Sequence, residues 1–174
     1  EFKAARKLRF SAHAKDLKSC NIFIVTVPTP VDRYKRPDLT PLRAASETVG
    51  RALKKGDIVI YESTVYPGCT EEICVPVLEQ FSSLRFNKHF YCGYSPERVN
   101  PGDKQHRLAT IRQVTSGSVP RIADLVNDLY ASIRAAGTYQ PSSIEAAGAA
   151  KFTAPIQQTR PLPTHHHTHQ HLTT

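Results

Sequence analysis

The sequence lacks several features that would assign it to a particular compartment. It contains no methionine, so we expect that it does not begin at a translation start and that its front is missing or was removed. No run approaches the roughly 18 apolar residues that a membrane span needs, and the N-terminus lacks the order of a secretory signal. We therefore expect a soluble, cytoplasmic protein with no membrane partner.

The four cysteines lack the spacing of a metal site. None belongs to a Cys-x-x-Cys pair, and no histidine stands at the distance typical of zinc ligands. Cys20 and Cys92 lie beside or inside strand-like apolar runs, where a free thiol behaves as a small buried hydrophobe. We predict no metal site and interpret these two cysteines as reduced core residues.

Charge does not identify a partner. The formal net charge of +8 favours anionic partners such as nucleotides, phosphates or nucleic acid. The basic residues are scattered without a block of five or six, and no nucleic-acid-binding motif accompanies them. We interpret them as a solvated surface and expect no nucleic acid partner.

Strand-like and helix-like segments alternate along the chain. Short β-branched and aromatic runs predict strands at 21–27, 57–63, 90–94 and around 112–115. Helices are predicted at 41–54, from Thr70, and after Pro120, with apolar residues at helical spacing: Ile122, Leu125, Val126, Leu129 and Ile133. This alternation predicts an α/β fold with a doubly wound, mostly parallel sheet.

Several residues are predicted to begin or end helices. Thr40 before Pro41 suggests an N-cap and a first-turn proline, and Lys54-Lys55-Gly56 a cationic last turn with a C-terminal glycine. Ser142 and Glu145 form a possible capping box for a helix over 146–151. From Pro155 to Thr174 the chain holds five His and almost no apolar residues, so we expect a disordered or foreign tail.

The residues that follow the predicted strands mark the candidate site. In a doubly wound sheet, ligands bind beyond the carboxyl ends of the strands. Strand ends here carry hydroxyls, a carboxylate and a guanidinium, in the segments 26–30, 62–65 and 95–102. Taken singly, Ser63 and Thr64 could cap a helix or tie a turn, and Glu97 and Arg98 could be a surface pair. Three such segments on one edge favour a binding site.

Three motifs resemble the UDP-glucose/GDP-mannose dehydrogenase family, and the resemblance runs from about Lys3 to Lys151. They are Val27-Pro28-Thr29-Pro30, Tyr61-Glu62-Ser63-Thr64-Val65-Tyr66-Pro67-Gly68 and Gly93-Tyr94-Ser95-Pro96-Glu97-Arg98-Val99-Asn100-Pro101-Gly102-Asp103. The branch that the chain is most similar to contains UDP-N-acetylglucosamine and UDP-N-acetylgalactosamine 6-dehydrogenases of Vi-type capsule and O-antigen synthesis.

The resemblance implies a Rossmann-like domain, NAD as cofactor, and oxidation of a sugar C6 alcohol to a carboxylate through an aldehyde and a cysteine thioester. It places an NAD site at the residues matching Val27, Pro28, Thr29, Pro30, Ser63, Thr64 and Val65. Thr64 also matches a threonine that helps to hold the hydrolytic water. Glu97 matches a carboxylate in acid/base work, and Lys151 a lysine that stabilises oxyanions.

The resemblance also implies a substrate. Glu97, Arg98, Val99 and Asn100 are similar to the substrate-facing loop of the N-acetylhexosamine branch. UDP-glucose enzymes carry a second glutamate where this chain has Pro101. A UDP-N-acetylhexosamine is therefore the expected substrate, with the gluco or galacto epimer left open, and a homodimer is the family's assembly.

Other positions depart from the family pattern. The Gly-x-Gly-x-x-Gly turn and the Gly-Gly-His-Cys nucleophile motif are both absent from these residues. Gly148 replaces an expected glutamate, and Pro155 stands where an asparagine is expected. We therefore predict the later part of an NAD-binding domain over 1–140, the start of a central dimerisation helix over 141–154, and a non-native tail over 155–174.

Three functional hypotheses follow. The first is a piece of an active 6-dehydrogenase that is itself inactive, because covalent catalysis requires the missing thiolate. The second is a non-catalytic nucleotide-binding or assembly module. The third, suggested only by charge, is a nucleic-acid binder.

Overall fold

The structure is a computed structural model that describes residues 8–34, 36–96, 112–134 and 136–149. The elements alternate between strands and helices, as the sequence predicts. In chain order they are η2 (Ala14–Ser19), β1 (Ile22–Val25), α1 (Thr40–Gly50), β2 (Ile58–Tyr61), the π-helical turn η3 (Thr70–Cys74), α2 (Val75–Ser82), β3 (Tyr91–Tyr94), β4 (Gln113–Val114), β5 (Ser116–Gly117), α3 (Pro120–Ala131) and β6 (Thr138–Tyr139).

The main sheet has the strand order β1-β2-β3-β5. Strands β1, β2 and β3 pair in parallel, and β5 pairs antiparallel with β3. A second, two-stranded sheet joins β4 and β6 in parallel. The predicted α/β class with a mostly parallel sheet is confirmed.

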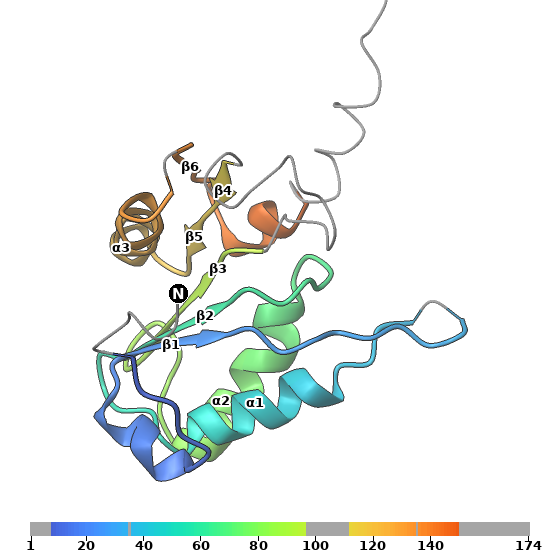
Figure 1. Ribbon diagram of the computed structural model, residues 1–174, viewed down its shortest axis with the longest axis vertical. Helices are drawn as coiled ribbons and strands as arrows, with labels where there is room; N and C mark the ends of the chain where they lie inside the picture. Colours follow the sequence, from blue (N-terminus) through green and yellow to red (C-terminus); the bar gives the residue numbers. More distant parts are fainter. Residues whose placement is uncertain (1–7, 35, 97–111, 135, 150–174) are drawn as a thin grey trace, which may run out of the picture.

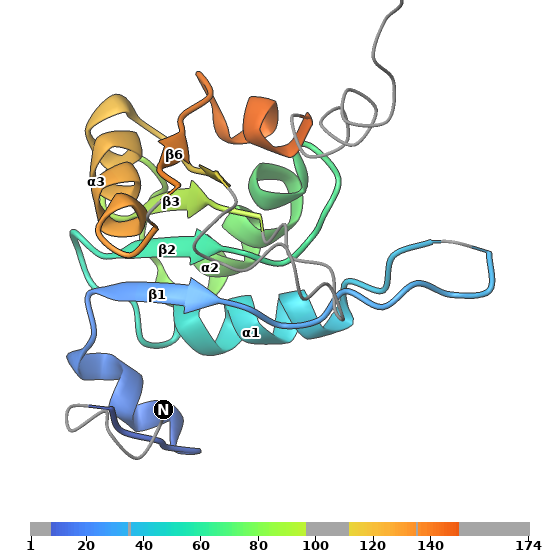
Figure 2. The ribbon, with the colours of Figure 1, turned by 45° about the horizontal axis from the view of Figure 1, so that its top comes forward.

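Helices cover the two faces of the sheet unequally (Figures 1 and 2). Helices α1 and α2 lie on one face, where Val59 and Tyr61 of β2 belong to the larger apolar cluster. Helix α3 lies on the other face, where Ile58 and Ile60 join the smaller cluster. Strand β2 is therefore buried on both faces, as its continuous apolar run predicts.

Strand β1 is buried on one face only. Phe23 and Val25 point into the larger cluster, whereas Ile22 and Ile24 are 41% and 47% exposed. These two side chains lie beside Ile58 and Ile60 in the parallel register, on the α3 face of the sheet. Helix α3 packs on β3 and β5, so the neighbouring edge strand β1 stays uncovered on that face.

Two predicted ends of the first helix are wrong. Thr40 is the first residue of α1 rather than its N-cap, and its N–H donates to an Asp38 carboxylate oxygen at 2.9 Å. The helix ends at Gly50 instead of Lys54. Lys54 lies in the following turn, where its N–H and its ammonium group both donate to the buried Asp57 carboxylate, at 2.8 and 3.0 Å.

The later half departs further from prediction. The strand predicted around 112–115 contains only the two-residue β4, which pairs with β6, whereas the strand that joins the main sheet is β5, just beyond the predicted range. Leu125 of α3 is 40% exposed, and Ile133, which was predicted to continue the same helix, lies beyond its end at Ala131 and is 70% exposed. Ser143, and not Ser142, caps the helix at 144–149, because the Ala146 N–H donates to the Ser143 hydroxyl at 3.0 Å.

No helix within the described ranges is both long and apolar enough to span a membrane. All four cysteines are free, and Cys92 is fully buried as predicted, while Cys20 is partly exposed.

Candidate functional site

The candidate site lies at the carboxyl edge of the parallel strands. In Figure 2 the arrows of β1, β2 and β3 point the same way, so the loops that follow them meet at one edge. Two backbone hydrogen bonds extend the ladder past the strands. The Glu62 N–H donates to the Val25 carbonyl and the Ser95 N–H to the Tyr61 carbonyl, both at 2.9 Å.

Two side-chain hydrogen bonds join the loop after β1 to the loop after β2. The Ser63 hydroxyl donates to the Val27 carbonyl at 2.6 Å, and the Thr29 hydroxyl donates to the Thr64 carbonyl at 2.7 Å. The loop after β2 supplies the donor of the first bond, and the loop after β1 supplies the donor of the second. The structure thereby brings together the residues that sequence analysis assigns to the NAD site, and fixes their backbones relative to each other.

Some of these residues are buried and support the loops, and others are exposed and could contact a ligand. Ser63 and Val65 are buried, so they hold the loop onto the apolar cluster below. Pro28, Pro30 and Thr64 are exposed at the edge, and Val27 and Thr29 are half-buried. A ligand at this edge would therefore meet the exposed prolines and Thr64, while Ser63 positions the loop.

A buried amide organises the loop after β3. The Gln113 side-chain amide of β4 donates to the Ser95 hydroxyl at 2.8 Å and to the Pro96 carbonyl at 3.1 Å. Gln113 and Ser95 are both buried. These bonds fix the backbone immediately before the segment that begins at Glu97.

Helix α3 also contributes to this edge. The Tyr130 hydroxyl donates to the Glu62 carboxylate, directly after β2. Burial, together with the neighbouring Glu62 carboxylate, raises the pKa of Tyr130 well above its ordinary value. Tyr130 therefore stays protonated and holds Glu62 in place.

The loop after β2 packs against the helix at 144–149. A Cβ atom at Gly148 would lie 3.0 Å from the Pro67 Cα atom, so a larger side chain would displace this loop. Gly148, where the family resemblance predicts a glutamate, thus allows the helix to approach the loop that carries Thr64.

Some predicted residues lie outside the described residues. They are Glu97, Arg98, Val99, Asn100 and Lys151. The Pro155 break and the His-rich tail lie there too.

Three of the four thiols in the described ranges are too buried to act as nucleophiles. Cys69, Cys74 and Cys92 are at most 1% exposed. A hydrogen bond from Cys74 lowers the pKa of Cys69, while that bond and burial raise the pKa of Cys74. Burial, followed by the charge of Glu71, raises the pKa of Cys92. Within the same ranges no group of three or more His, Cys, Asp or Glu side chains could hold a metal ion.

Two residues that support the site have no predicted role in it. The sequence predicts only a strand at Gln113, and the predicted apolar pattern after Pro120 does not include Tyr130. A signal exists for Tyr130, because Ile122, Val126 and Tyr130 repeat every four residues and share one helix face. No local signal marks Gln113, whose partners Ser95 and Pro96 lie on another loop.

Comparison with known proteins agrees with this geometry. A sequence model described as the NAD binding domain of the UDP-glucose/GDP-mannose dehydrogenase family matches residues 1–134. The chain is 65% identical to a UDP-N-acetyl-D-glucosamine 6-dehydrogenase of Pseudomonas aeruginosa and 58% identical to one of Salmonella typhi. Each alignment covers 91% of this chain and 37% of the relative, so the chain spans little more than a third of their length.

A solved structure is similar as well. The UDP-D-ManNAc dehydrogenase of Pyrococcus horikoshii superimposes with a TM-score of 0.74 at 32% identity, over 85% of this chain and 35% of that one. The match therefore extends from the motifs to the arrangement of the strands that carry them. The chain belongs to the UDP-glucose/GDP-mannose dehydrogenase family, and its residues 1–134 match the NAD-binding domain of that family.

Proposed function

We propose that this chain supplies part of an NAD-dependent dehydrogenase that oxidises the C6 alcohol of a UDP-N-acetylhexosamine to a carboxylate for surface polysaccharide synthesis. The observation that carries the proposal is the pair of bonds Ser63–Val27 and Thr29–Thr64, which holds two family motifs side by side at the carboxyl edge. The relatives' identities of 58–65% support the N-acetylhexosamine branch.

The edge fits a dinucleotide. NAD supplies hydride acceptance when bound, and the residues of this chain bind and orient it. Pro28, Pro30 and Thr64 are exposed on loops that two hydrogen bonds tie together, and such preorganisation would lower the entropic cost of binding. The sequence contains no Gly-x-Gly-x-x-Gly turn, so the pyrophosphate contacts of the family are not among its residues.

The catalytic roles are proposals from the family pattern. Thr64, exposed at the edge, would hold a water beside the sugar C6, and Glu97 would exchange a proton with it. Lys151 would stabilise negative charge on the C6 oxygen, and Arg98, Val99 and Asn100 would contact the sugar nucleotide.

The exposure of strand β1 supports a division of the chain into parts of a larger protein. We assign 1–140 to the later part of the NAD-binding domain, 141–154 to the start of a central helix and 155–174 to a non-native tail. No strand in the described part of the chain pairs with the outer edge of β1, and Ile22 and Ile24 are exposed. In a complete domain, the glycine-rich βαβ unit would pair with this edge and cover both side chains. The complete enzyme would be a cytoplasmic homodimer.

The test uses the complete protein that contains this chain. We expect NADH formation with UDP-N-acetylglucosamine or UDP-N-acetylgalactosamine, and less with UDP-glucose. Glu97→Gln should lower kcat at least a hundredfold, whereas the matched control Glu79→Gln, on α2, should leave kcat unchanged. Equal turnover of UDP-glucose would contradict the substrate assignment, and an unchanged kcat in Glu97→Gln would contradict the role of that carboxylate.

The second candidate is an assembly module. The outer edge of β1, which no described strand covers, favours it, because an unpaired strand edge can accept another strand. Co-purification of the 174-residue chain with an intact dehydrogenase subunit would support this function, and a lone monomer in the presence of that subunit would contradict it.

A further inference from the structure

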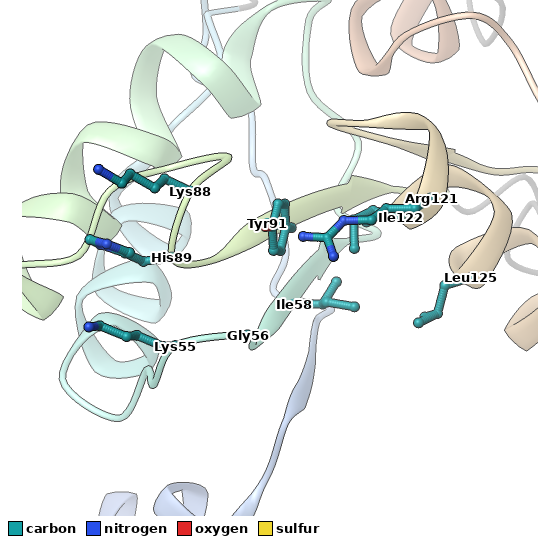
Figure 3. Close-up of a pocket in the computed structure, with 9 residues that line it drawn as sticks. All are labelled: Lys55, Gly56, Ile58, Lys88, His89, Tyr91, Arg121, Ile122 and Leu125. Carbon is teal, nitrogen blue, oxygen red and sulfur yellow. The ribbon is translucent and has the colours of Figure 1, made fainter.

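The cleft in Figure 3 does not bring its charged groups together. It has a volume of about 450 Å³ and lies where β2, β3 and α3 begin. The Lys55 and Lys88 ammonium groups point away from Arg121 and out of the cleft, and the His89 ring does so too. The Arg121 guanidinium lies over the Tyr91 ring, with its Cζ atom 4.4 Å from the ring centre. One anionic ligand would not contact all of these cations.

A second cleft, of about 430 Å³, differs in its polar groups. It lies between the start of η3, the end of β5, the first turn of α3 and the segment 140–144. No Lys, Arg or His is among the described residues that line it, although the chain has a formal net charge of +8. Its polar side chains are hydroxyls, amides and one carboxyl group, that of Glu71.

The Glu71 carboxyl group has an oxygen without a partner. Oε2 is buried and accepts no hydrogen bond from a described residue. Burial raises the pKa of Glu71 most, a bond from its own backbone N–H lowers it, and the nearby Glu145 and Glu72 carboxylates raise it again. A buried carboxylate is costly unless a cation or a donor compensates it. A cation in this cleft would therefore stabilise Glu71.

Hydrogen bonds and close packing fix the walls of this second cleft. The Ser118 N–H donates to the Cys92 carbonyl at 2.8 Å, and the Ser118 hydroxyl accepts a bond from the Cys92 N–H at 3.2 Å. A Cβ atom at Gly117 would lie 2.3 Å from the Ala123 nitrogen, so the end of β5 packs closely on α3. Walls that are already in place lower the entropic cost of binding a ligand.

Other polar groups of the second cleft can accept hydrogen bonds. The Gln140 Nε2 atom donates to an Asp124 carboxylate oxygen at 3.2 Å, so the Oε1 atom of Gln140 remains an acceptor. Asn87 and Ser142 also line the cleft, and each carries a side-chain oxygen. Phe86 adds apolar surface beside these groups. The cleft therefore offers a carboxylate, several neutral acceptors and an apolar wall.

We propose that this second cleft binds an alkylguanidinium group. A guanidinium is planar, always charged and carries five N–H donors, so it can bond to Glu71 and to the neutral acceptors together. The alkyl chain would lie against Phe86 and Ile144. A metal ion fits less well, because no group of three or more His, Cys, Asp or Glu side chains in the described ranges could hold one.

The alkylguanidinium group can come from a free small molecule or from an arginine side chain elsewhere in the complete protein. The proposal does not rest on the NAD site, because none of the residues 27–30 and 63–65 is among the described residues that line the cleft.

The experiment is a titration of the ¹⁵N-labelled 174-residue chain with butylguanidinium chloride, followed by amide chemical shifts. We expect saturable shifts at Gly117, Ser118 and Gln140. Butylurea, which has a similar shape and no charge, should bind at least about tenfold more weakly, and Glu71→Gln should weaken butylguanidinium binding by a similar factor. The matched control Glu47→Gln removes the same charge from the exposed surface of α1 and should bind as the unchanged chain does.

The same titration of the complete protein distinguishes the two sources. Binding as tight as that of the 174-residue chain would indicate a free molecule as the ligand. Binding by the 174-residue chain alone would indicate that an arginine of the complete protein fills the cleft. Both results support the proposal.

Three outcomes would overturn the proposal. The first is an absence of saturable shifts around Gly117 in the folded chain, whatever happens at Thr29 and Ser63, whose shifts report on the NAD site. The second is equal affinity for butylurea and butylguanidinium, which would exclude a contribution from charge. The third is an equal loss of affinity in Glu71→Gln and Glu47→Gln, which would mean that only the net charge of the chain attracts the cation.

Discussion

Removal of the Ser63 hydroxyl should loosen the two loops of the candidate NAD site. Ser63→Ala leaves the carbonyl of the half-buried Val27 without its 2.6 Å donor, and Ser63 itself is only 6% exposed, so water has little access to the lost bond. An unsatisfied, partly buried acceptor costs about 1–2 kcal/mol, so the free energy of unfolding should fall by that amount. Thr29→Val removes the 2.7 Å bond to Thr64 at a more exposed position, and should cost about 0.5–1 kcal/mol.

Both losses can be measured by urea unfolding of the 174-residue chain. Because the two bonds join the same pair of loops, the double variant should depart from additivity by about 0.5 kcal/mol. If half of a 1.5 kcal/mol loss also weakens binding, the affinity of the complete protein for NAD should fall about three-fold.

Thr48→Val is the matched control. Its hydroxyl bonds to the Ala44 carbonyl on the exposed surface of α1, at 2.9 Å, and its loss should change stability by less than about 0.5 kcal/mol. The reasoning is refuted if Ser63→Ala unfolds at the same urea concentration as the unchanged chain, or if Thr48→Val costs as much.

Three further predictions concern packing, pH and thiol reactivity. Gly93→Ala should destabilise the chain by about 1–3 kcal/mol in thermal unfolding, because the new Cβ atom would lie 2.9 Å from a Val126 methyl group; an unchanged Tm would contradict the packing of α3. Burial raises the pKa of Glu71, so its ionisation removes stability as pH rises through that pKa. Glu71→Gln should therefore stabilise the chain at pH 7 and lose this advantage near pH 4 in urea unfolding, and equal effects of Glu72→Gln would contradict it. In the folded chain Cys20 should react first with a thiol reagent, and rapid labelling of all four thiols would contradict the burial of the other three: Cys69, Cys74 and Cys92.

The sequence predicts best those features that depend on a short run of residues. Strands β1, β2 and β3 were predicted because apolar runs end at Pro28, Glu62 and Ser95, and the carboxyl-edge loops follow from their parallel order. Helix ends were predicted less well because neighbouring polar groups compete for the same N–H. Leu39 is the N-cap of α1 where Thr40 was expected, the Thr40 N–H donates to Asp38, and Asp57 binds Lys54 beyond the end of the helix.

Long-range partners could not be predicted. Tyr130 and Glu62 are 68 residues apart, and only the packing of α3 across β2 and β3 brings them together. The Ser63–Val27 bond joins residues 36 apart, and neither residue type requires the other. The sequence therefore locates the candidate site, while the contacts that make its loops rigid emerge from the tertiary structure.

Strand β1 shows where sequence pattern and structure disagree most. Its run Ile22-Phe23-Ile24-Val25 is apolar without alternation, which is typical of a strand covered on both faces. In the structure Phe23 is 5% exposed and Ile24 is 47% exposed, so only one face is covered. The equally apolar β2 is buried on both faces, because α3 lies over it. The composition of β1 thus fits a position inside a wider sheet, which supports the proposed pairing with a glycine-rich unit at its free edge.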